Sequence, residues 1–469
     1  MSTAGSLPAL GDLSLIGETT EVPLITGGAT RYKNLDYAAS APALATVAEA
    51  VTELLPLYSS VHRGAGYKSQ LSTAAYEGAR VAVHGFFDAR HDDCVVFVRN
   101  TTDAMNLLAE SLPRDSSVVA FSSEHHANLL PWQRIHTVRY LGCPATPGEA
   151  LEALERHMRS ERTDLVAVTG ISNVTGEVWP VAEITALAHQ YGARVVLDAA
   201  QLAPHLPVSI RGLDVDYLAA SGHKMYAPFG AGVLIGRPDW LGQGAPYMRG
   251  GGAVDFVTTD EVLWTSLPDR QEAGSPNVIG AVALGVAAQT LQAYGMDRIG
   301  QHERELGAYA RQRLGAIAAV DMYRLWPEEA DRLGLVTFNV RGFDHSLVAA
   351  ILSAEHGIGV RHGCFCAHPL MLSLLRISDA EVRRARDQLR DGQHARIPGA
   401  VRMSLGLGSS AADIDAMAEA IASVANHGPR WTYRLDPSTG DYGPSPDPRA
   451  VPRVHFPLSW SHPGGGESS

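Results

Sequence analysis

Short apolar segments alternate with amphipathic ones from about residue 70 to residue 290. The apolar segments are rich in β-branched residues, a composition typical of strands buried on both faces of a parallel sheet, whereas a stretch such as 150–160 has a helical period. This alternation predicts an α/β fold with a mostly parallel sheet covered by helices on both faces. The strands we expect are 95–98, 117–121, 165–168, 195–197, 215–220 and 232–235.

The pattern changes after about residue 300, which indicates a second, smaller α+β unit with a strand at 335–340 and a closing helix at 414–424. Ser378 and Glu381 form a capping-box pattern that predicts a charged, inserted helix near 378–392. We therefore divide the chain by sequence into four parts. They are an irregular segment 1–30, a large domain 31–295, a small domain 296–428 and a Pro/Gly-rich tail 429–469 without a core of its own.

Composition and charge narrow the class of partner. The chain has 469 residues and a formal net charge of −12, which disfavours nucleic acid or an anionic membrane as the main partner. No apolar run approaches the roughly 20 residues that span a bilayer, and the N-terminus lacks the features of a secretory leader. The sequence predicts a cytoplasmic protein with small-molecule or protein partners. Its four cysteines do not suggest a disulfide framework.

Lys224 is the first candidate for chemistry. It closes the segment Ser-Gly-His-Lys, directly after the predicted strand 215–220. A lysine amine becomes a nucleophile when burial or a nearby cation lowers its pKa, and it can then condense with a carbonyl as a Schiff base. The alternative is a surface lysine in an ordinary turn.

Asp198 directly follows the predicted strand 195–197. It makes the interpretation of Lys224 as a Schiff-base lysine more specific. Side chains at the carboxyl ends of parallel strands face the crevice where α/β sheets bind ligands. Pyridoxal phosphate needs an acid beside its ring nitrogen, because the protonated ring is the electron sink. The pair Asp198 and Lys224 therefore favours this cofactor over a helix cap at Asp198.

Eight motifs occur in a fixed order along the chain, namely 35–40 (LDYAAS), 61–64 (VHRG), 99–104 (RNTTDA), 124–128 (EHHAN), 172–176 (SNVTG), 221–224 (SGHK), 272–277 (EAGSPN) and 361–367 (RHGCFCA). In this order they resemble the motifs of class V aminotransferase-fold enzymes, and among them those of cysteine desulfurases and selenocysteine lyases of the sulfur-mobilisation (group II) type. The resemblance covers about residues 30–425. It implies a pyridoxal phosphate enzyme of fold type I with a seven-stranded sheet, an N-terminal segment packed on the small domain, and a homodimer with shared active sites.

A phosphate site is expected where Thr101 and Thr102 begin a helix, because backbone N–H groups at a helix N-terminus bind anions. Ordinary capping is the alternative. By resemblance, Ser221 and His223 add donors to this site, and Ser275 reaches the phosphate of the neighbouring subunit. The resemblance also implies that His125 stacks on the cofactor ring with a pKa near neutrality suited to proton transfer. Asn173 and Gln201 are implied near the phenolic oxygen of the cofactor.

The substrate side of the site is implied by the carboxyl half of the chain. Arg402 corresponds to the arginine that grips the amino-acid carboxylate, and Arg361 is assigned to the same site. Cys366 corresponds to the nucleophile that takes sulfur as a persulfide, and its alternative is a buried structural cysteine.

The motif departs from the family pattern at Cys364 and Phe365, where relatives commonly carry two histidines. If the segment is extended, Cys364 faces the same way as Cys366 and could resolve the persulfide. A Cys-x-Cys pair with no second pair does not predict a metal site.

The resulting hypothesis is desulfuration of cysteine, or of selenocysteine, to alanine, with a protein as a possible sulfur acceptor. A carbon-sulfur β-lyase, an epimerase or an aminotransferase on the same scaffold is the alternative, since fold does not fix function. A non-catalytic protein that keeps the fold is disfavoured by the presence of Lys224, Asp198, His125 and Arg402 together.

Overall fold

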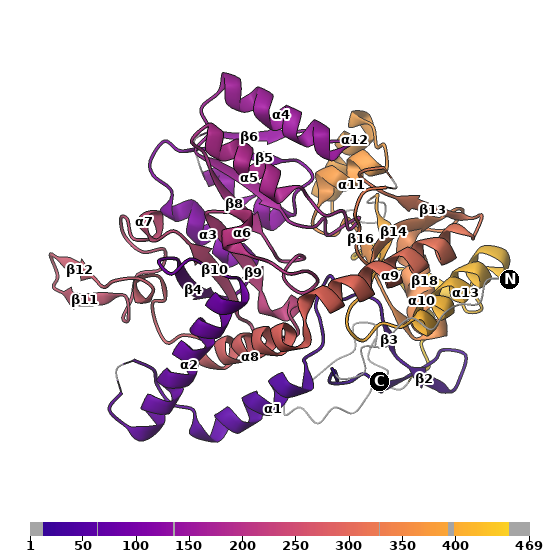
Figure 1. The fold of residues 1–469 in the computed structure, drawn as a ribbon. Coiled ribbons are helices and arrows are strands. Elements are labelled where there is room, and N and C mark those ends of the chain that lie inside the picture. Colours follow the sequence, from indigo (N-terminus) through magenta and orange to yellow (C-terminus); the bar gives the residue numbers. More distant parts are fainter. Residues whose placement is uncertain (1–12, 63, 135–136, 328, 393–397, 450–469) are drawn as a thin grey trace.

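The computed structural model describes residues 13–62, 64–134, 137–327, 329–392 and 398–449. Its larger part is built on a seven-stranded sheet (Figure 1). Strand β10 runs antiparallel to both of its neighbours, β4 and β9, and the other pairings in the sheet are parallel. In spatial order the strands are β4 (Cys94–Val98), β10 (Gly232–Gly236), β9 (Tyr217–Ser221), β8 (Arg194–Asp198), β7 (Leu165–Thr169), β5 (Ser117–Phe121) and β6 (Thr137–Leu141).

The sheet is buried on both faces, as the β-branched runs predicted. On β8, Val195 and Leu197 contribute to one hydrophobic cluster, and Val196 between them contributes to the other. The first cluster includes side chains from α1, α2, α4, α5 and α8, and the second includes α3 and the short α7. These helices, with the short α6, are α1 (Ala45–Leu54), α2 (Tyr67–Phe86), α3 (Thr101–Ser111), α4 (Pro147–Ser160), α5 (Val181–Gln190), α6 (Ile210–Leu213), α7 (Pro238–Leu241) and α8 (Val278–Tyr294).

The smaller lobe has its own core around an antiparallel sheet of four strands. Helices α9, α10 and α13 pack on it, and the N-terminal segment joins it through a parallel pair of β3 with β15. The elements of this part are β3 (Lys33–Asn34), α9 (Met296–Gly315), β13 (Val320–Tyr323), β14 (Leu335–Val340), α10 (His345–His356), β15 (Ile358–Gly359), β16 (Arg361–Gly363), α11 (His368–Leu374), α12 (Asp379–Arg390), β17 (Ala400–Ser404) and α13 (Ala411–His427).

Gly295 separates the large lobe from the small one at the junction of α8 and α9. The two helices meet at an angle of 79°. Gly295 takes a φ of +104°, a backbone conformation that residues other than glycine rarely adopt. Within the described residues no single helix is long and apolar enough to cross a membrane, and only this bent pair meets that test when its two helices are taken together.

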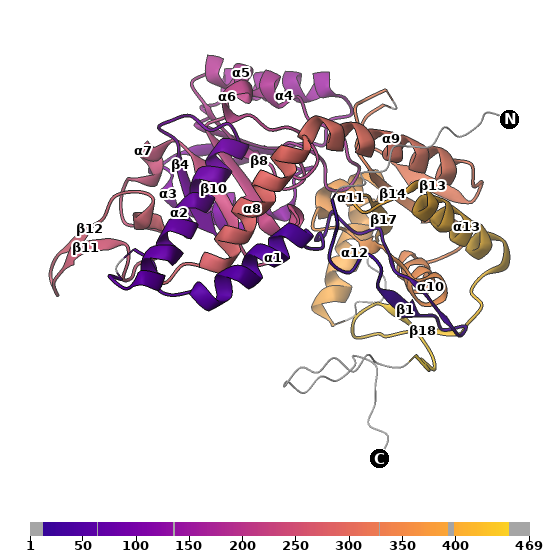
Figure 2. The same cartoon turned by 60° about the horizontal axis from the view of Figure 1, so that its bottom comes forward.

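Three sequence predictions need additions or corrections. The described part of segment 1–30 is not wholly irregular, because β1 (Glu21–Pro23) pairs with β2 (Ala29–Arg31). The tail also contains a hairpin, β18 (Tyr433–Leu435) with β19 (Tyr442–Pro444), which lies near α10 in Figure 2 and contacts this helix through β19. Residues 1–12 and 450–469 of the two predicted end segments lie outside the described residues. Strand β6 was missed, because it lies at the edge of the sheet and is only partly buried.

The predicted charged helix near 378–392 is confirmed as α12. Ser378 caps it through a complete capping box with Glu381, and none of its residues is buried. A helix held by its cap and by charges, without a packed face, contributes little to the core.

We expect Gly285→Ala to destabilise the protein, because α2 and α8 approach each other closely there. A Cβ at Gly285 would lie 2.7 Å from the Cα of Ala79. The overpacking should cost about 1–3 kcal/mol and outweigh the gain of about 1 kcal/mol in helix propensity. Gly78→Ala on α2 is the matched control, since its Cβ would meet nothing within 4 Å. In urea unfolding, the free energy of unfolding of Gly78→Ala should equal or exceed that of the parent, and that of Gly285→Ala should be lower. The reverse order would refute the packing argument.

Candidate active site

Most of the predicted site residues line one cavity of about 240 Å³ at the carboxyl edge of the large sheet. Loops after β7, β8 and β9 form its floor, the start of α3 forms one wall, and the small lobe closes it with the loop after β16 and with β17. Twelve of the predicted residues line it, namely Thr101, Thr102, His125, Asn173, Asp198, Gln201, Ser221, His223, Lys224, Arg361, Cys366 and Arg402.

Lys224 lies in a single helical turn that follows β9. Gly222 makes this turn possible, since a Cβ there would lie 2.8 Å from the carbonyl oxygen of Ala231. Burial lowers the pKa of Lys224 to about 8, although the carboxylate of Asp198 opposes the shift. About a tenth of this amine is therefore uncharged at pH 7, far more than of an ordinary lysine, and the uncharged form is the one that a nucleophile or base requires.

Asp198 is the last residue of β8 and is buried. One of its oxygens accepts a hydrogen bond of 2.9 Å from the backbone N–H of Ala200. Burial raises the pKa of Asp198, and the N–H of Ala200 and the charge of Lys224 counteract the rise. Such a carboxylate favours a protonated, positively charged group placed against it.

The start of α3 and the turn that holds Lys224 form an anion site. The hydroxyl of Ser221 accepts the backbone N–H of Thr101 at 2.8 Å and lies 2.7 Å from the Thr101 hydroxyl. Asn100 caps the helix by accepting the N–H of Asp103. Two hydroxyls at the positive end of an 11-residue helix can bind a phosphate group.

His125 follows β5. We predicted a pKa near neutrality for this histidine, but the structure gives a lower one. Burial, with a smaller contribution from the charge of Lys224, lowers this pKa to about 3. The ring atom Nδ1 accepts the backbone N–H of Ala127 at 3.0 Å, so the neutral ring carries its proton on Nε2. His125 is thus a neutral hydrogen-bond donor in the cavity rather than a group that titrates near pH 7.

Arg402 is buried, and its guanidinium joins several segments. One nitrogen donates to the carbonyl of Asn173 at 2.8 Å and another to Asp36 Oδ1 at 3.1 Å. The ring of Phe365 packs 5.0 Å from the guanidinium carbon. Asp36 is a site residue that sequence reasoning missed, although it belongs to the motif 35–40, because only the fold brings it to Arg402.

The loop after β16 presents Cys366 at the cavity, where the residue is exposed. Phe365 and Cys366 both have positive φ values, 53° and 55°, so the segment is a tight turn rather than the extended one we considered. The backbone N–H of His126 donates to the carbonyl of Cys366 at 2.7 Å, and the Asn173 amide donates to that of Phe365 at 2.8 Å. The turn is therefore held on both sides of the thiol.

Cys364 differs from Cys366 in burial, although both residues line a further cavity of about 200 Å³. It is buried in a small apolar cluster, and its thiol donates to the carbonyl of Pro398 at 3.0 Å. Burial raises the pKa of this thiol to about 11, which disfavours the reactive thiolate. Because Phe365 and Cys366 have positive φ values, the two cysteines are not related by the extended segment that we considered.

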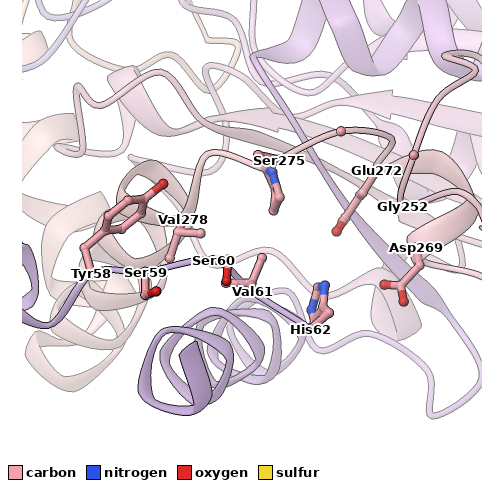
Figure 3. A pocket seen from close by; sticks show the side chains of 13 residues that line it. Tyr58, Ser59, Ser60, Val61, His62, Gly252, Asp269, Glu272, Ser275 and Val278 are labelled. Carbon is pink, nitrogen blue, oxygen red and sulfur yellow. The ribbon is translucent and has the colours of Figure 1, made fainter. Parts of the chain in front are cut away.

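Ser275 lies outside the cavity of Lys224. It lines a separate cavity of about 360 Å³ with Tyr58, His62 and Gly252 (Figure 3). Within the described residues, this serine therefore does not complete the phosphate site of its own chain. Arg63, which belongs to the motif 61–64, lies outside the described residues.

Pyridoxal phosphate fits the residues that the cavity brings together. It needs an amine, a carboxylate for the ring nitrogen and donors for the phosphate, and Lys224, Asp198 and the Thr101–Ser221 hydroxyls line one cavity. Two further polar atoms, Oε1 of Gln201 and Nε of Arg402, are buried without hydrogen-bond partners among the described residues. Buried polar atoms usually have partners, so these two are consistent with a polar ligand.

Comparison with known proteins agrees with this site. Residues 33–417 match the family model described as aminotransferase class-V. A probable cysteine desulfurase of Halalkalibacterium halodurans is 39% identical over 348 residues, which is 72% of this chain and 84% of that protein. A cysteine desulfurase of Dickeya dadantii is 40% identical over 349 residues, with 72% and 83% of the two chains covered.

Solved structures give the same result. The apo structure of a cysteine desulfurase from Thermococcus onnurineus superposes with a TM-score of 0.74 at 30% identity, covering 88% of this chain and 98% of that one. A cysteine desulfurase from Escherichia coli gives a TM-score of 0.69 at 31% identity, covering 83% and 93%. The chain is therefore a member of the class-V aminotransferase family, in its cysteine desulfurase branch.

Proposed function

We propose that this protein is a pyridoxal phosphate-dependent cysteine desulfurase, which removes sulfur from cysteine, or selenium from selenocysteine, and releases alanine. The observation that carries the proposal is that Cys366 lines the same cavity as Lys224, Asp198 and Arg402. A thiol in that position can take the sulfur as a persulfide. When bound, pyridoxal phosphate supplies the electron sink for the charge left when a bond at the substrate Cα breaks.

Lys224 and Asp198 divide the proton chemistry. Lys224, with its pKa lowered to about 8, holds the cofactor and can accept the Cα proton of the substrate. Asp198, buried and hydrogen-bonded, is the residue that would keep a proton on the ring nitrogen of the bound cofactor. His125 donates from Nε2 without changing its own charge, because its pKa lies far below the working pH.

Arg402 and Arg361 bind the substrate carboxylate, and neighbouring groups fix the direction of Arg402. One nitrogen donates to Asn173 and another to Asp36, and three of the five guanidinium N–H groups are left for a ligand. The Phe365 ring restrains the guanidinium plane. An arginine fixed in this way binds a carboxylate with little loss of side-chain entropy.

Cys366 completes the reaction on the small-lobe side of the cavity. The two hydrogen bonds to the carbonyls of Phe365 and Cys366 hold the turn, while the thiol itself remains exposed. An acceptor can therefore reach the sulfur from outside once the substrate has delivered it. The rival carbon-sulfur lyase, epimerase and aminotransferase reactions need no thiol at this place.

We infer further that the protein is a homodimer. The hairpin of β11 (Val254–Val257) and β12 (Val262–Trp264) extends from the large lobe (Figure 1), with Phe256 59% and Leu263 57% exposed. Large apolar side chains in a projecting hairpin are typical of an interface. A second copy would also give a role to the cavity of Ser275 as part of the partner's phosphate site.

Light scattering should give twice the mass of one chain, and a monomer at micromolar concentration would contradict the inference of a homodimer.

Cofactor uptake should depend on pH through Lys224. The uncharged amine reacts, so the rate at which the apoprotein binds pyridoxal phosphate should rise with pH and level off above about 8, whereas an ordinary lysine with a pKa of 10.5 would show a rise continuing beyond pH 10. Stopped-flow absorbance measures this rate.

The chain has two other lysines, Lys33 and Lys68, so borohydride reduction and peptide mapping can assign the cofactor to one lysine. Label on either of them would refute the role of Lys224.

Cys366→Ser should abolish desulfuration, with alanine formation from cysteine falling about a hundredfold or more because the sulfur has no nucleophile to accept it. The cofactor spectrum and its change on adding cysteine should persist, since the cofactor half of the site is untouched. Cys364→Ser is the matched control and should stay within about twofold of the parent, as its thiol is buried and bonded to a carbonyl. Alanine, pyruvate and protein-bound sulfur should be assayed together. Pyruvate with full activity in Cys366→Ser would favour a β-lyase instead.

A further inference from the structure

A further cavity, of about 200 Å³, adjoins the Cys366 turn. Cys366 and Phe365 line both this cavity and that of Lys224. Cys366 therefore borders two chambers. The first holds the groups that act on the amino acid, and the mechanism above assigns nothing to the second.

The walls of the second chamber come from the small lobe and from the C-terminal tail. Asp344 and His345 at the start of α10, His362 on β16, and the tail turn 439–441 line it, together with Gly363, Cys364 and His368 on either side of the Cys366 turn. The rings of His345 and His362 pack with their centroids 5.5 Å apart. Gly440 takes a φ of +78° in the tail turn, which lets the chain reverse direction between β18 and β19.

The tail wall is anchored at several points. Asp441 pairs with His362 at 3.4 Å, and the backbone N–H of Tyr442 donates to the Ser346 hydroxyl at 2.8 Å. Arg430 makes hydrogen bonds of 2.9 and 3.1 Å to the buried carboxylate of Glu355 on α10. The tail follows residue 417, where the match to the family model ends. This wall is thus an addition to the part of the chain shared with the family.

Size and charge restrict what the second chamber can hold. A volume of about 200 Å³ lies below the usual range of roughly 300–1,000 Å³ for sites of drug-sized ligands, so it suits a molecule of a few heavy atoms. Asp344 and Asp441 contribute negative charge. Burial lowers the pKa of His362 and of His368, so both rings are neutral near pH 7. The lining therefore disfavours an anion.

We propose that this chamber admits the sulfur acceptor, and that the acceptor is a small thiol that carries an amine, so that its thiolate has no net charge. The proposal rests on the persulfide formed at Cys366 in the proposed function. The acceptor enters as its thiolate, after losing its proton to solvent, and attacks the outer sulfur of the persulfide. The bond between the two sulfurs breaks, Cys366 leaves as a thiolate, and the acceptor departs as a persulfide. No oxidant or reductant is needed, and charge is balanced.

Transfer rates can be measured on the holoenzyme after loading Cys366 with sulfur from cysteine and removing the excess. Mass spectrometry then follows loss of the added sulfur with cysteamine, mercaptoacetate or reduced thioredoxin. Transfer of the sulfur to cysteamine should be faster than transfer to the other two acceptors when all are compared at equal thiolate concentration. Thr439→Trp, which fills the chamber, should slow cysteamine about tenfold or more, corresponding to about 1.4 kcal/mol in the barrier. Pro437→Trp is the control, because it lies in the same exposed loop but not in the lining, and it should behave as the parent.

The charge of the chamber gives a second test. Asp441→Asn should reduce the preference for cysteamine over mercaptoacetate by about threefold, the effect of one unit charge acting at close range through solvent-like surroundings. Faster transfer to thioredoxin than to cysteamine, or an unchanged rate in Thr439→Trp, would overturn the proposal.

The same comparison can be made without desulfurase activity. Cys366 is converted chemically to a mixed disulfide with 2-thiopyridine, and its thiolysis is timed with each thiol. If no persulfide forms from cysteine, the proposed function fails. The ranking of thiols in this second assay then still supports or refutes the chamber as a binding site for small thiols.

Discussion

The buried guanidinium of Arg402 connects the two lobes, and the geometry of the site depends on it. Arg402 belongs to the small-lobe sheet, yet it donates to the carbonyl of Asn173 in the large lobe and to Asp36 in the N-terminal segment. The Asn173 amide in turn holds the carbonyl of Phe365, whose ring packs against the same guanidinium. A charged group removed from water requires partners of this kind. Those partners place the Cys366 turn at the cavity.

Burial sets the ionisation of the groups around this connection, and it acts in opposite directions on acids and bases. It lowers the pKa of Lys224 and His125 and raises that of Asp198, because each shift disfavours a charge in a poorly solvated place. The result is an amine that is partly uncharged, an imidazole that is neutral and a carboxyl that is stabilised by a nearby cation. These are complementary roles within one cavity of about 240 Å³.

Sequence patterns predicted the strands of the large sheet well, except for the edge strand β6. Runs such as 195–197 are apolar at every position because the sheet is covered on both faces, whereas the edge strand β6 has a mixed pattern and was missed. The residues of the cavity were found through motifs, since carboxyl ends of parallel strands converge by topology. The turn that follows Cys364 depends on positive φ values at Phe365 and Cys366, which no periodicity encodes. The pKa of His125 depends on burial by segments that are distant in sequence, and the position of Asp36 beside Arg402 likewise depends on the fold.

The course of helix α9 has a mechanical meaning for the site. The helix begins after the 79° bend against the large lobe, where Ile299 joins the large core, and it ends in the core of the small lobe, where Leu306 and Leu314 pack. Lys224 and Asp198 belong to the large lobe, whereas Arg402 and Cys366 belong to the small one. One helix anchored in both cores resists a change in the angle between the lobes. It therefore acts as a strut that keeps the amine and the thiol at a fixed separation.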